Sequence, residues 1–300
     1  MLYKKNIKWL TVGDIIAEDI YDGETLILKA GTILTMGSII DIQTTGMEYV
    51  LVKQVPTTNK GNKIIDNSIK QAFTVEYLNE VFYEFLLKAG KSGRYHSILS
   101  SDDNYHFIND LFTSIMAKET VENIMSALKI WDMYSYEHSL DVFIIGSLWG
   151  KQLELSNIQE IATGFLLHDI GKIKIPRDIL QKKGKLTFAE FEKVKKHPIY
   201  GAQLLCKLGF SEQICHLAKF HHLRVDGTGY PNNQPERLSK EVKMLMITDV
   251  FSALTLDRPY RKAFSTQDAL EILISDKILF DKELLTSFTE FVYPDYSYIL

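Results

Sequence analysis

Short apolar runs between glycines open the chain, and longer stretches with a helical spacing of apolar residues follow. Residues 24–29 and 47–53 are rich in β-branched and apolar side chains and lie next to glycines, so they predict strands. Between them, residues 35–45 carry apolar side chains at near-helical spacing before Gly46, which predicts a short helix that ends at a glycine. Residues 1–55 therefore predict a small β-rich module that docks or regulates and carries no catalytic residues.

Two amphipathic stretches connect this module to the rest of the chain. After a polar linker at residues 56–62, apolar side chains recur at every fourth position across residues 65–85. The polar, glycine-containing residues 90–104 end this first helix, and a second apolar face extends over residues 108–131. We expect these ridges to pack within the chain, with a homodimer through the connector helices as the alternative.

The remaining sequence predicts a helical domain. From about residue 130 onward few alternating runs occur, and three Ser or Thr residues have the spacing of capping boxes at helix starts: Ser156 with Gln159, Thr187 with Glu190, and Ser265 with Asp268. The sequence thus predicts an α+β protein in three parts. These are the β-rich module of residues 1–55, a helical connector of residues 56–120 and an all-α domain of residues 121–300.

The composition limits the partners that the chain can have. Its 300 residues, 46% of them hydrophobic, can bury a substantial core, and 34 basic against 38 acidic residues give a net charge of −4. A nucleic-acid polymer favours a basic surface, so we expect none as partner, although a local basic pocket could still bind a small nucleotide. No apolar run reaches the ~18 residues of a membrane span, which predicts a cytoplasmic protein without a membrane partner. We expect Cys206 and Cys215 to be separate, buried thiols.

Polar side chains interrupt the apolar stretch of residues 163–176. Adjacent His168 and Asp169 end a helical apolar run, a glycine follows, and Lys172 stands three residues after the aspartate. An imidazole, a carboxylate and an ammonium are costly in a core unless they are paired. They suit a site that binds a metal ion and a phosphate.

Other histidines and a second aspartate extend this candidate site. Three of the eight histidines lie in ordinary contexts and are expected on the surface or in the core: His96, His106 and His216. The remaining five and two aspartates are the candidate metal ligands: His138, His168, Asp169, His197, His221, His222 and Asp249. Any one of these histidines alone is better explained as a structural residue, and only the set together predicts a metal site.

The chemistry of this set indicates the kind of metal centre. Imidazoles and carboxylates suit iron, manganese, zinc or nickel, and the lack of cysteine ligands argues against a structural zinc. Seven ligands are too many for one ion with an open position. They suit two ions that share a carboxylate, which is an arrangement for in-line displacement at phosphorus.

Three sequence elements in this order resemble the HD-GYP family. They are the pair His168-Asp169 with its following Gly-Lys, the HHxxxDGxGYP element that begins at His221, and the DRPYR run that begins at Asp257. The match covers about residues 125–290, and the first 55 residues resemble more weakly a module that often precedes such domains. Members of the family are bacterial phosphodiesterases that hydrolyse cyclic di-GMP, so the resemblance implies an HD-type helical catalytic domain.

The resemblance implies a role for each matching residue. The seven candidate ligands would bind two divalent transition-metal ions, iron or manganese first and nickel or zinc as alternatives, with Asp169 as the bridging carboxylate. Asp169 and Lys172 would be catalytic, and Lys172 would also contact the substrate phosphate. Tyr230, Arg258 and Arg261 would contact the substrate. The structural alternatives are a surface lysine at position 172 and helix-end salt bridges for the two arginines.

Two positions depart from the family pattern. Some members hold a third metal through a glutamate four residues before the first histidine, and this chain has Tyr134 there, so we expect two metals. The family's glutamate after the paired histidines is Leu223 here. That change leaves the ligand set intact but puts the rate and the substrate preference in question.

The residues and the resemblance together predict hydrolysis of cyclic di-GMP to the linear dinucleotide pGpG in bacterial second-messenger signalling, with GMP as an alternative final product. A hydroxide held between the two metals would attack the phosphorus. Two alternatives stay open. One is a phosphohydrolase for another cyclic dinucleotide or nucleotide, and the other is a non-catalytic nucleotide-binding scaffold that signals to a protein partner through the N-terminal module.

Overall fold

The computed structural model divides the chain into two compact units, with the division between Glu84 and Phe85. It describes residues 2–7, 10, 14–23, 25–34, 42, 45, 47–53, 82–86, 89, 95, 98–99, 101–232, 235–258 and 261–294. The predicted linker, nearly all of the first connector helix and most of the predicted helix at residues 35–45 lie outside these described residues. The three-part division of the chain stays a prediction.

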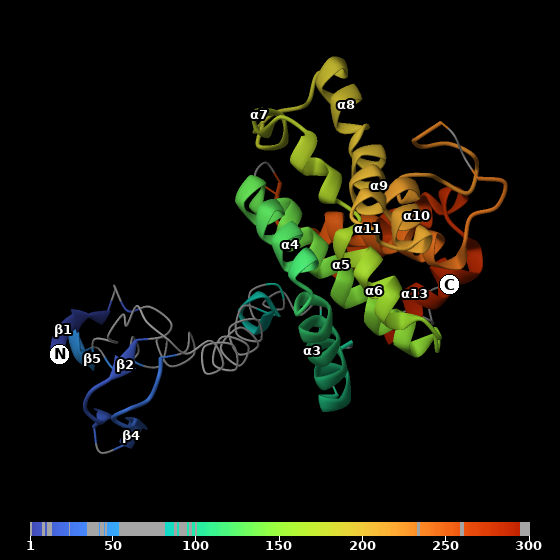
Figure 1. Ribbon diagram of the computed structural model, residues 1–300. Helices are drawn as coiled ribbons and strands as arrows, with labels where there is room; N and C mark the ends of the chain where they lie inside the picture. Colours follow the sequence, from blue (N-terminus) through green and yellow to red (C-terminus); the bar gives the residue numbers. More distant parts are fainter. Residues whose placement is uncertain are drawn as a thin grey trace. The chain divides into compact units, whose positions relative to one another are not determined.

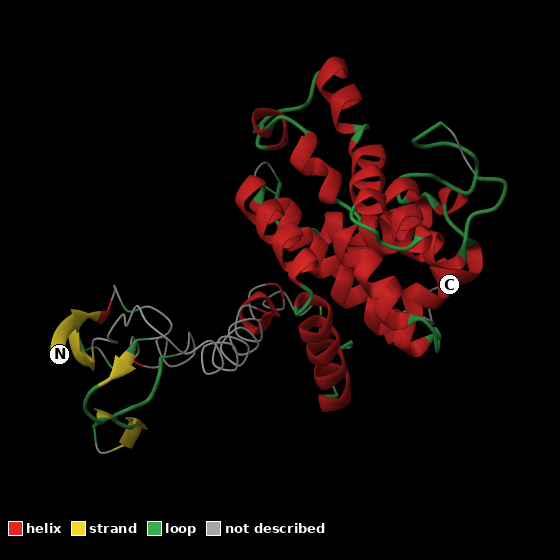
Figure 2. Ribbon diagram, in the orientation of Figure 1, coloured by secondary structure: helices red, strands yellow, loops and turns green. Residues whose placement is uncertain are grey.

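The first unit contains short strands in two antiparallel sheets (Figure 2). In the three-stranded sheet, β5 (Tyr49–Lys53) lies between β1 (Leu2–Asn6) and β2 (Ile15–Ile16). The other sheet pairs β3 (Ile20–Asp22) with β4 (Thr25–Leu28). Both β4 and β5 fall within segments that the sequence predicts to be strands. Apolar side chains of this unit form one buried core: Leu10, Ile16, Ile20, Leu34, Ile42, Val50 and Val52.

The regular secondary structure of the second unit is helical in its described part, apart from isolated bridges in its loops (Figures 1 and 2). Its elements are α3 (Asp102–Met116), α4 (Glu119–Trp131), α5 (Met133–Gln152), α6 (Ile158–Leu167), η2 (Ile170–Lys174), α7 (Arg177–Leu180), α8 (Phe188–Val194), α9 (His197–Lys207), α10 (Glu212–Phe220), α11 (Lys240–Thr255), α12 (Thr266–Ser275), η3 (Lys277–Leu279) and α13 (Lys282–Val292). The chain is thus mostly helical with a small antiparallel sheet, in agreement with the predicted α+β class. No described helix combines the length and the apolar character needed to cross a membrane, and the cytoplasmic location stays a prediction.

Helix α5 is the central element of the second unit. Nearly all its residues between Ser135 and Gly150 are buried, and it contacts α3, α4, α6 and α11 (Figure 1). Trp149 donates a hydrogen bond to the Ser287 hydroxyl of α13 (3.1 Å), and its ring packs edge-on against Phe288 at 5.0 Å. A helix that is covered on all sides carries any polar side chain into the interior, so the polar residues of α5 need partners there.

The predicted single helix at residues 108–131 is wrong, because α3 and α4 are separate helices. The break comes at Ala117 and Lys118, where the Lys118 carbonyl accepts the hydrogen bonds that begin α4. No glycine or proline marks this break, so the apolar spacing continues through it. Most of the ridge is buried inside the unit, from Ile108 to Leu128, which supports packing within the chain.

The predicted helix starts are confirmed at two of three places. Thr187 and Glu190 form the predicted capping box at α8, and the predicted cap of α12 is also present. The prediction for Ser156 is wrong, because α6 begins one residue later, after Asn157. The side chain of Gln159 donates instead to a serine of α3 (2.8 Å), so it does not return to the helix start.

The expectation of two separate, buried thiols is also wrong. Cys206 on α9 and Cys215 on α10 are joined by a disulfide with their Cα atoms 6.0 Å apart, and Cys206 is exposed. Helices α9 and α10 lie against each other (Figure 1), so residues nine positions apart meet across the turn. Sequence spacing alone does not reveal this contact, because it depends on how tightly the two helices are joined.

Candidate metal centre

The seven predicted ligands come together in the second unit, although 111 residues separate His138 from Asp249. They lie at helix ends and on two long helices: His138 on α5, His168 and Asp169 between α6 and η2, His197 at the start of α9, His221 and His222 after α10, and Asp249 on α11. Six of the seven are buried, and the side chain of His222 is 20% exposed. His106 and His216 are exposed and lie outside this cluster, and His96 lies outside the described residues.

The ligand atoms form two groups, each within 4.8 Å. The first group contains Asp169, His197, His221 and His222, and Asp169 Oδ1 lies 3.1 Å from His197 Nε2 and 3.8 Å from His221 Nε2. A group of this kind offers one carboxylate oxygen and three imidazoles to a single cation.

The second group contains His138, His168 and Asp249. Asp249 Oδ1 lies 2.9 Å from His138 Nε2 and 3.8 Å from His168 Nε2. The second oxygen of Asp169, Oδ2, faces this group at 3.5 Å from His168 Nε2 and 3.8 Å from His138 Nε2. Asp169 therefore presents one oxygen to each group, which is the geometry that a bridging carboxylate needs.

Backbone carbonyls set the orientation of three of the imidazoles. In His168, His197 and His221 the Nδ1–H donates to the carbonyl three residues earlier, each time at 2.8 Å. Because Nδ1 carries the proton, Nε2 keeps a free lone pair that points into the cluster. The buried Nε2 of His168 has no hydrogen-bond partner among the described residues, as expected for an atom that binds a metal.

His138 is oriented by a side chain instead. Its Nδ1 lies 2.9 Å from the Ser252 hydroxyl, while Nε2 faces Asp249. Ser252 is not among the site residues predicted from the sequence. Its signal is the position three residues after Asp249, on the same face of α11.

The two carboxylates are held in their ionised form. Burial opposes ionisation of Asp169, but the ammonium of Lys172 and the neighbouring imidazoles hold the pKa of Asp169 well below its usual range. Burial likewise opposes ionisation of Asp249, and the hydrogen bond from His138 and the nearby imidazoles hold its pKa well below the usual range.

Three of the histidines, in contrast, are held neutral. Burial lowers the pKa of His168 and lowers those of His221 and His222 further. Neighbouring histidines add to the lowering of the His221 pKa. Neutral imidazoles and ionised carboxylates are the forms that bind metal. The donor set and its charge state therefore fit metal binding at both groups.

Two glycines permit close backbone contacts at the cluster. A Cβ atom at Gly171 would lie 1.9 Å from the His197 carbonyl oxygen, so this glycine lets η2 contact the start of α9. Gly229 has a φ of +91°, and a Cβ atom there would lie 2.2 Å from the His222 carbonyl oxygen. This contact holds the loop that carries Tyr230 against the ligands, and the Tyr230 ring lies 4.6 Å from that of His222.

The predicted substrate-contacting residues differ in their surroundings. Lys172 donates to Asp169 Oδ2, and its pKa is raised because the attraction of Asp169 outweighs burial. The Arg258 guanidinium lies 5.4 Å above the ring of Tyr134. Arg261 donates to backbone carbonyls near the end of α11 and stacks on Phe264, so its guanidinium is engaged at the helix end.

The two departures from the family pattern have distinct environments. The ring of Tyr134 lies parallel to that of His138 at 6.0 Å, and its buried hydroxyl has no hydrogen-bond partner within the described part of the chain. Burial raises the pKa of Tyr134, although Arg258 opposes this, so its hydroxyl stays protonated. Leu223 is fully buried and belongs to the core, with its backbone bridged to Gly229.

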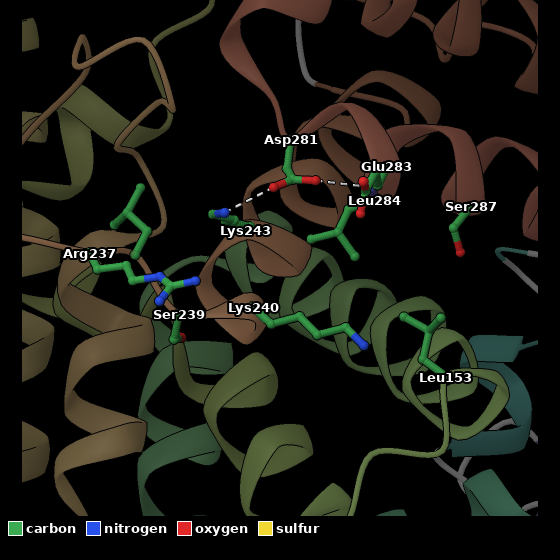
Figure 3. A pocket seen from close by; sticks show the side chains of 10 residues that line it. Leu153, Arg237, Ser239, Lys240, Lys243, Asp281, Glu283, Leu284 and Ser287 are labelled. Carbon is green, nitrogen blue, oxygen red and sulfur yellow. Dashed lines mark hydrogen bonds and ion pairs between the residues drawn. The ribbon is translucent and has the colours of Figure 1, made fainter.

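Of two cavities in the second unit, one lies beside the site. One, of about 810 Å³, is lined at one end by Tyr134, Lys172 and Arg258, so it opens next to the ligand cluster. The other, of about 590 Å³, contains the Lys243–Asp281 ion pair (Figure 3) and lies at the start of α11. It contains none of the ligands, and ten residues of helix, roughly 15 Å, separate its Ser239 from Asp249 on the same helix.

Residues 146–284 of the chain match the model of the HD domain family. Cyclic di-GMP phosphodiesterase PA4108 of Pseudomonas aeruginosa is 34% identical over 62% of this chain and 47% of its own length. 3'3'-cGAMP-specific phosphodiesterase 3 of Vibrio cholerae is 37% identical over 47% of this chain and 31% of its own. A solved HDG"Y"P protein of Bdellovibrio bacteriovorus aligns over 97% of this chain and 99% of its own, with 13% identity and a TM-score of 0.49.

The chain spans about half or less of the length of these curated relatives. The resemblance recognised from the HD, GYP and DRPYR elements is confirmed by the match to the HD domain family and by similarity to proteins named as cyclic di-GMP phosphodiesterases.

Proposed function

We propose that this chain is a metal-dependent phosphodiesterase that hydrolyses cyclic di-GMP to pGpG. The observation that carries the proposal is the pair of ligand groups that share Asp169, one with three histidines and the other with two histidines and Asp249. The 34% identity to a named cyclic di-GMP phosphodiesterase supports the substrate. The resident ions are two divalent transition metals, because imidazole with carboxylate suits iron, manganese, nickel and zinc. The family resemblance places iron or manganese first.

The ions, when bound, supply an activated water and positive charge for the phosphate oxygens. The remaining work falls to side chains of the chain. Lys172 is the nearest cation to the ligands, and its raised pKa keeps it charged, so it stabilises the negative charge that builds on the phosphate oxygens. Arg258 presents a second cation at the same cleft. Tyr230, whose ring covers His222, limits the access of bulk water.

A second substrate class deserves the same assay. The relative from Vibrio cholerae is named as specific for 3'3'-cGAMP and is 37% identical over its matched part. Leu223 replaces the family's polar residue with a buried apolar one, so the site lacks one group that could select between bases. Hydrolysis of 3'3'-cGAMP in preference to cyclic di-GMP would change the proposed substrate and leave the metal chemistry unchanged.

The test is turnover by the purified full chain loaded with iron, manganese or nickel. We expect cyclic di-GMP to disappear and pGpG to accumulate when the nucleotides are separated by chromatography. Asp169→Ala should abolish turnover, while Asp276→Ala, an exposed aspartate beyond α12, should leave it unchanged. If all three metal-loaded samples leave every cyclic dinucleotide intact, the enzyme proposal is wrong, and a nucleotide-binding scaffold becomes the better explanation.

A further inference from the structure

The cleft beside the metal ligands extends well beyond the residues that the proposed reaction uses. Its volume of about 810 Å³ lies within the roughly 300–1,000 Å³ of small-molecule sites. Tyr134, Lys172 and Arg258 line the cleft beside the metal centre. The rest of the cleft, its far end, is lined by Ile179, Leu180, residues 182–188, Phe191 and Val194. A phosphodiester group alone would fill a small part of this space.

The far end of the cleft is positively charged. Lys182, Lys183 and Lys185 line it, and Lys182 is neutralised by Glu190 at 2.6 Å. Neither Lys183 nor Lys185 has a carboxylate partner in the part of the chain that the structure describes. The carboxylate of Asp132, which also lines the cleft, is engaged in capping α5. Two lysines in this state leave charge for an anion.

Two aromatic rings line the same cleft as these lysines. The side chain of Phe188 is 81% exposed and that of Phe191 is 44% exposed, and both line the cleft. Single exposed apolar residues are common on protein surfaces. Here, however, the two rings share a cavity with unpaired cations, and rings beside cations are how proteins hold the bases and phosphates of single-stranded nucleotides.

The loop that carries the lysines is fixed to the helix that carries the rings. Glu190 accepts from Lys182 and from the backbone N–H of Thr187, and these bonds lower the pKa of Glu190 to about 2. The capping box at Thr187 adds a reciprocal hydrogen bond. The positions of lysines and rings relative to each other are therefore set before a ligand arrives, which lowers the entropic cost of binding.

We propose that this far end is the subsite for the nucleotide of the cyclic dinucleotide that is not being cleaved, with its phosphate on Lys183 and Lys185 and its purine stacked on Phe188 and Phe191. The proposal rests on the proposed function, since it assumes a substrate with two nucleotides. It deepens that function, because it names the surface by which the site distinguishes a cyclic dinucleotide from a simple phosphodiester.

The experiment compares two substrates on the metal-loaded full chain: cyclic di-GMP, and bis(p-nitrophenyl) phosphate, which has no purine or second phosphate. Phe188→Ala should raise the KM for cyclic di-GMP roughly 5- to 150-fold, the effect of losing one base–aromatic stack. The double variant Lys183→Ala, Lys185→Ala should raise the same KM and flatten its dependence on salt. Both variants should hydrolyse bis(p-nitrophenyl) phosphate as the wild type does.

Matched controls come from η3, which carries an exposed apolar residue and an exposed lysine. Ile278→Ala and Lys277→Ala should change neither substrate's kinetics. An unchanged KM for cyclic di-GMP in the subsite variants would overturn the proposal, as would an equal loss on both substrates, because that loss would mean a damaged metal centre.

Failure of the proposed function has a different signature. A wild-type chain that hydrolyses neither substrate refutes the phosphodiesterase, and calorimetric binding of cyclic di-GMP then tests the subsite directly. In that case Phe188→Ala must weaken binding relative to Ile278→Ala. Equal affinities, or no binding by the wild type, would refute the subsite.

Discussion

Gly171 offers a direct test of how the ligands are positioned, because a single added carbon would separate two elements of the site. A Cβ atom there would lie 1.9 Å from the His197 carbonyl oxygen and 2.5 Å from the Gly201 nitrogen. Both atoms belong to the backbone of α9, so no side-chain rotation relieves the clash. In Gly171→Ala, α9 must therefore move away from η2 and carry His197 with it.

The expected cost has two parts. Overpacking of a close contact costs about 1–3 kcal/mol or more of folding free energy. For a domain of this size each kcal/mol lowers the midpoint of thermal unfolding by roughly 2–4 °C, so the midpoint should fall by roughly 2–12 °C. Displacing His197 from Asp169 should also weaken metal binding. Disturbing a residue that orients a ligand typically lowers metal affinity by roughly 10- to 100-fold, and a displaced ligand should lose at least as much.

Gly184→Ala is the matched control for this substitution. Its added Cβ meets no described atom within 4 Å, and its φ lies outside the left-handed region. This variant should keep its metal and its melting temperature, or gain stability by about 0.4–1 kcal/mol through a less flexible unfolded chain. Thermal unfolding and metal analysis of both variants give the readouts. If Gly171→Ala behaves like Gly184→Ala, the close contact between η2 and α9 does not position the ligands.

Three further perturbations probe other features. Ser252→Ala removes the hydroxyl that orients His138 and should lower metal affinity roughly 10- to 100-fold, as measured by chelator competition. Unchanged affinity would mean that packing alone sets the orientation of the His138 ring. Thr187→Ala removes a helix cap and should cost about 0.5–2 kcal/mol in denaturant unfolding, with an unchanged midpoint as the contrary result. The metal-free protein should lose stability as the pH falls from 7.5 to 5.5, because three histidines with lowered pKa values take up protons only on unfolding once the pH is below about 6.5. These histidines are His168, His221 and His222, and each contributes at most about 1.4 kcal/mol per pH unit. A melting temperature that does not change with pH over this range would refute their neutral state.

The sequence indicates which side chains come together at this site because they are chemically unusual where they stand. Asp249 lies within an apolar stretch of α11, and His168 with Asp169 ends the apolar helix α6. Such residues signal a site from their local setting, since a core tolerates them only with partners. The structure adds that Asp169 divides its two oxygens between the groups, a fact that needs coordinates.

Other features depend on contacts that leave no local pattern. Helices α3 and α4 share a continuous apolar spacing, so the break at Lys118 is invisible in the periodicity. The disulfide of Cys206 and Cys215 depends on the tightness of the turn between α9 and α10. Ser252 is an ordinary helix serine until His138, more than a hundred residues earlier in the chain, is placed beside it.

The central claim is that the seven ligands bind two metal ions, with Asp169 shared between them. Metal analysis of anaerobically purified protein tests this most directly, with Asp169→Ala measured beside the wild type. We predict two transition-metal ions per wild-type chain and a loss of metal in the variant. A wild-type chain that binds no metal or one ion under iron- and manganese-replete conditions, or a variant that keeps two, would contradict the account.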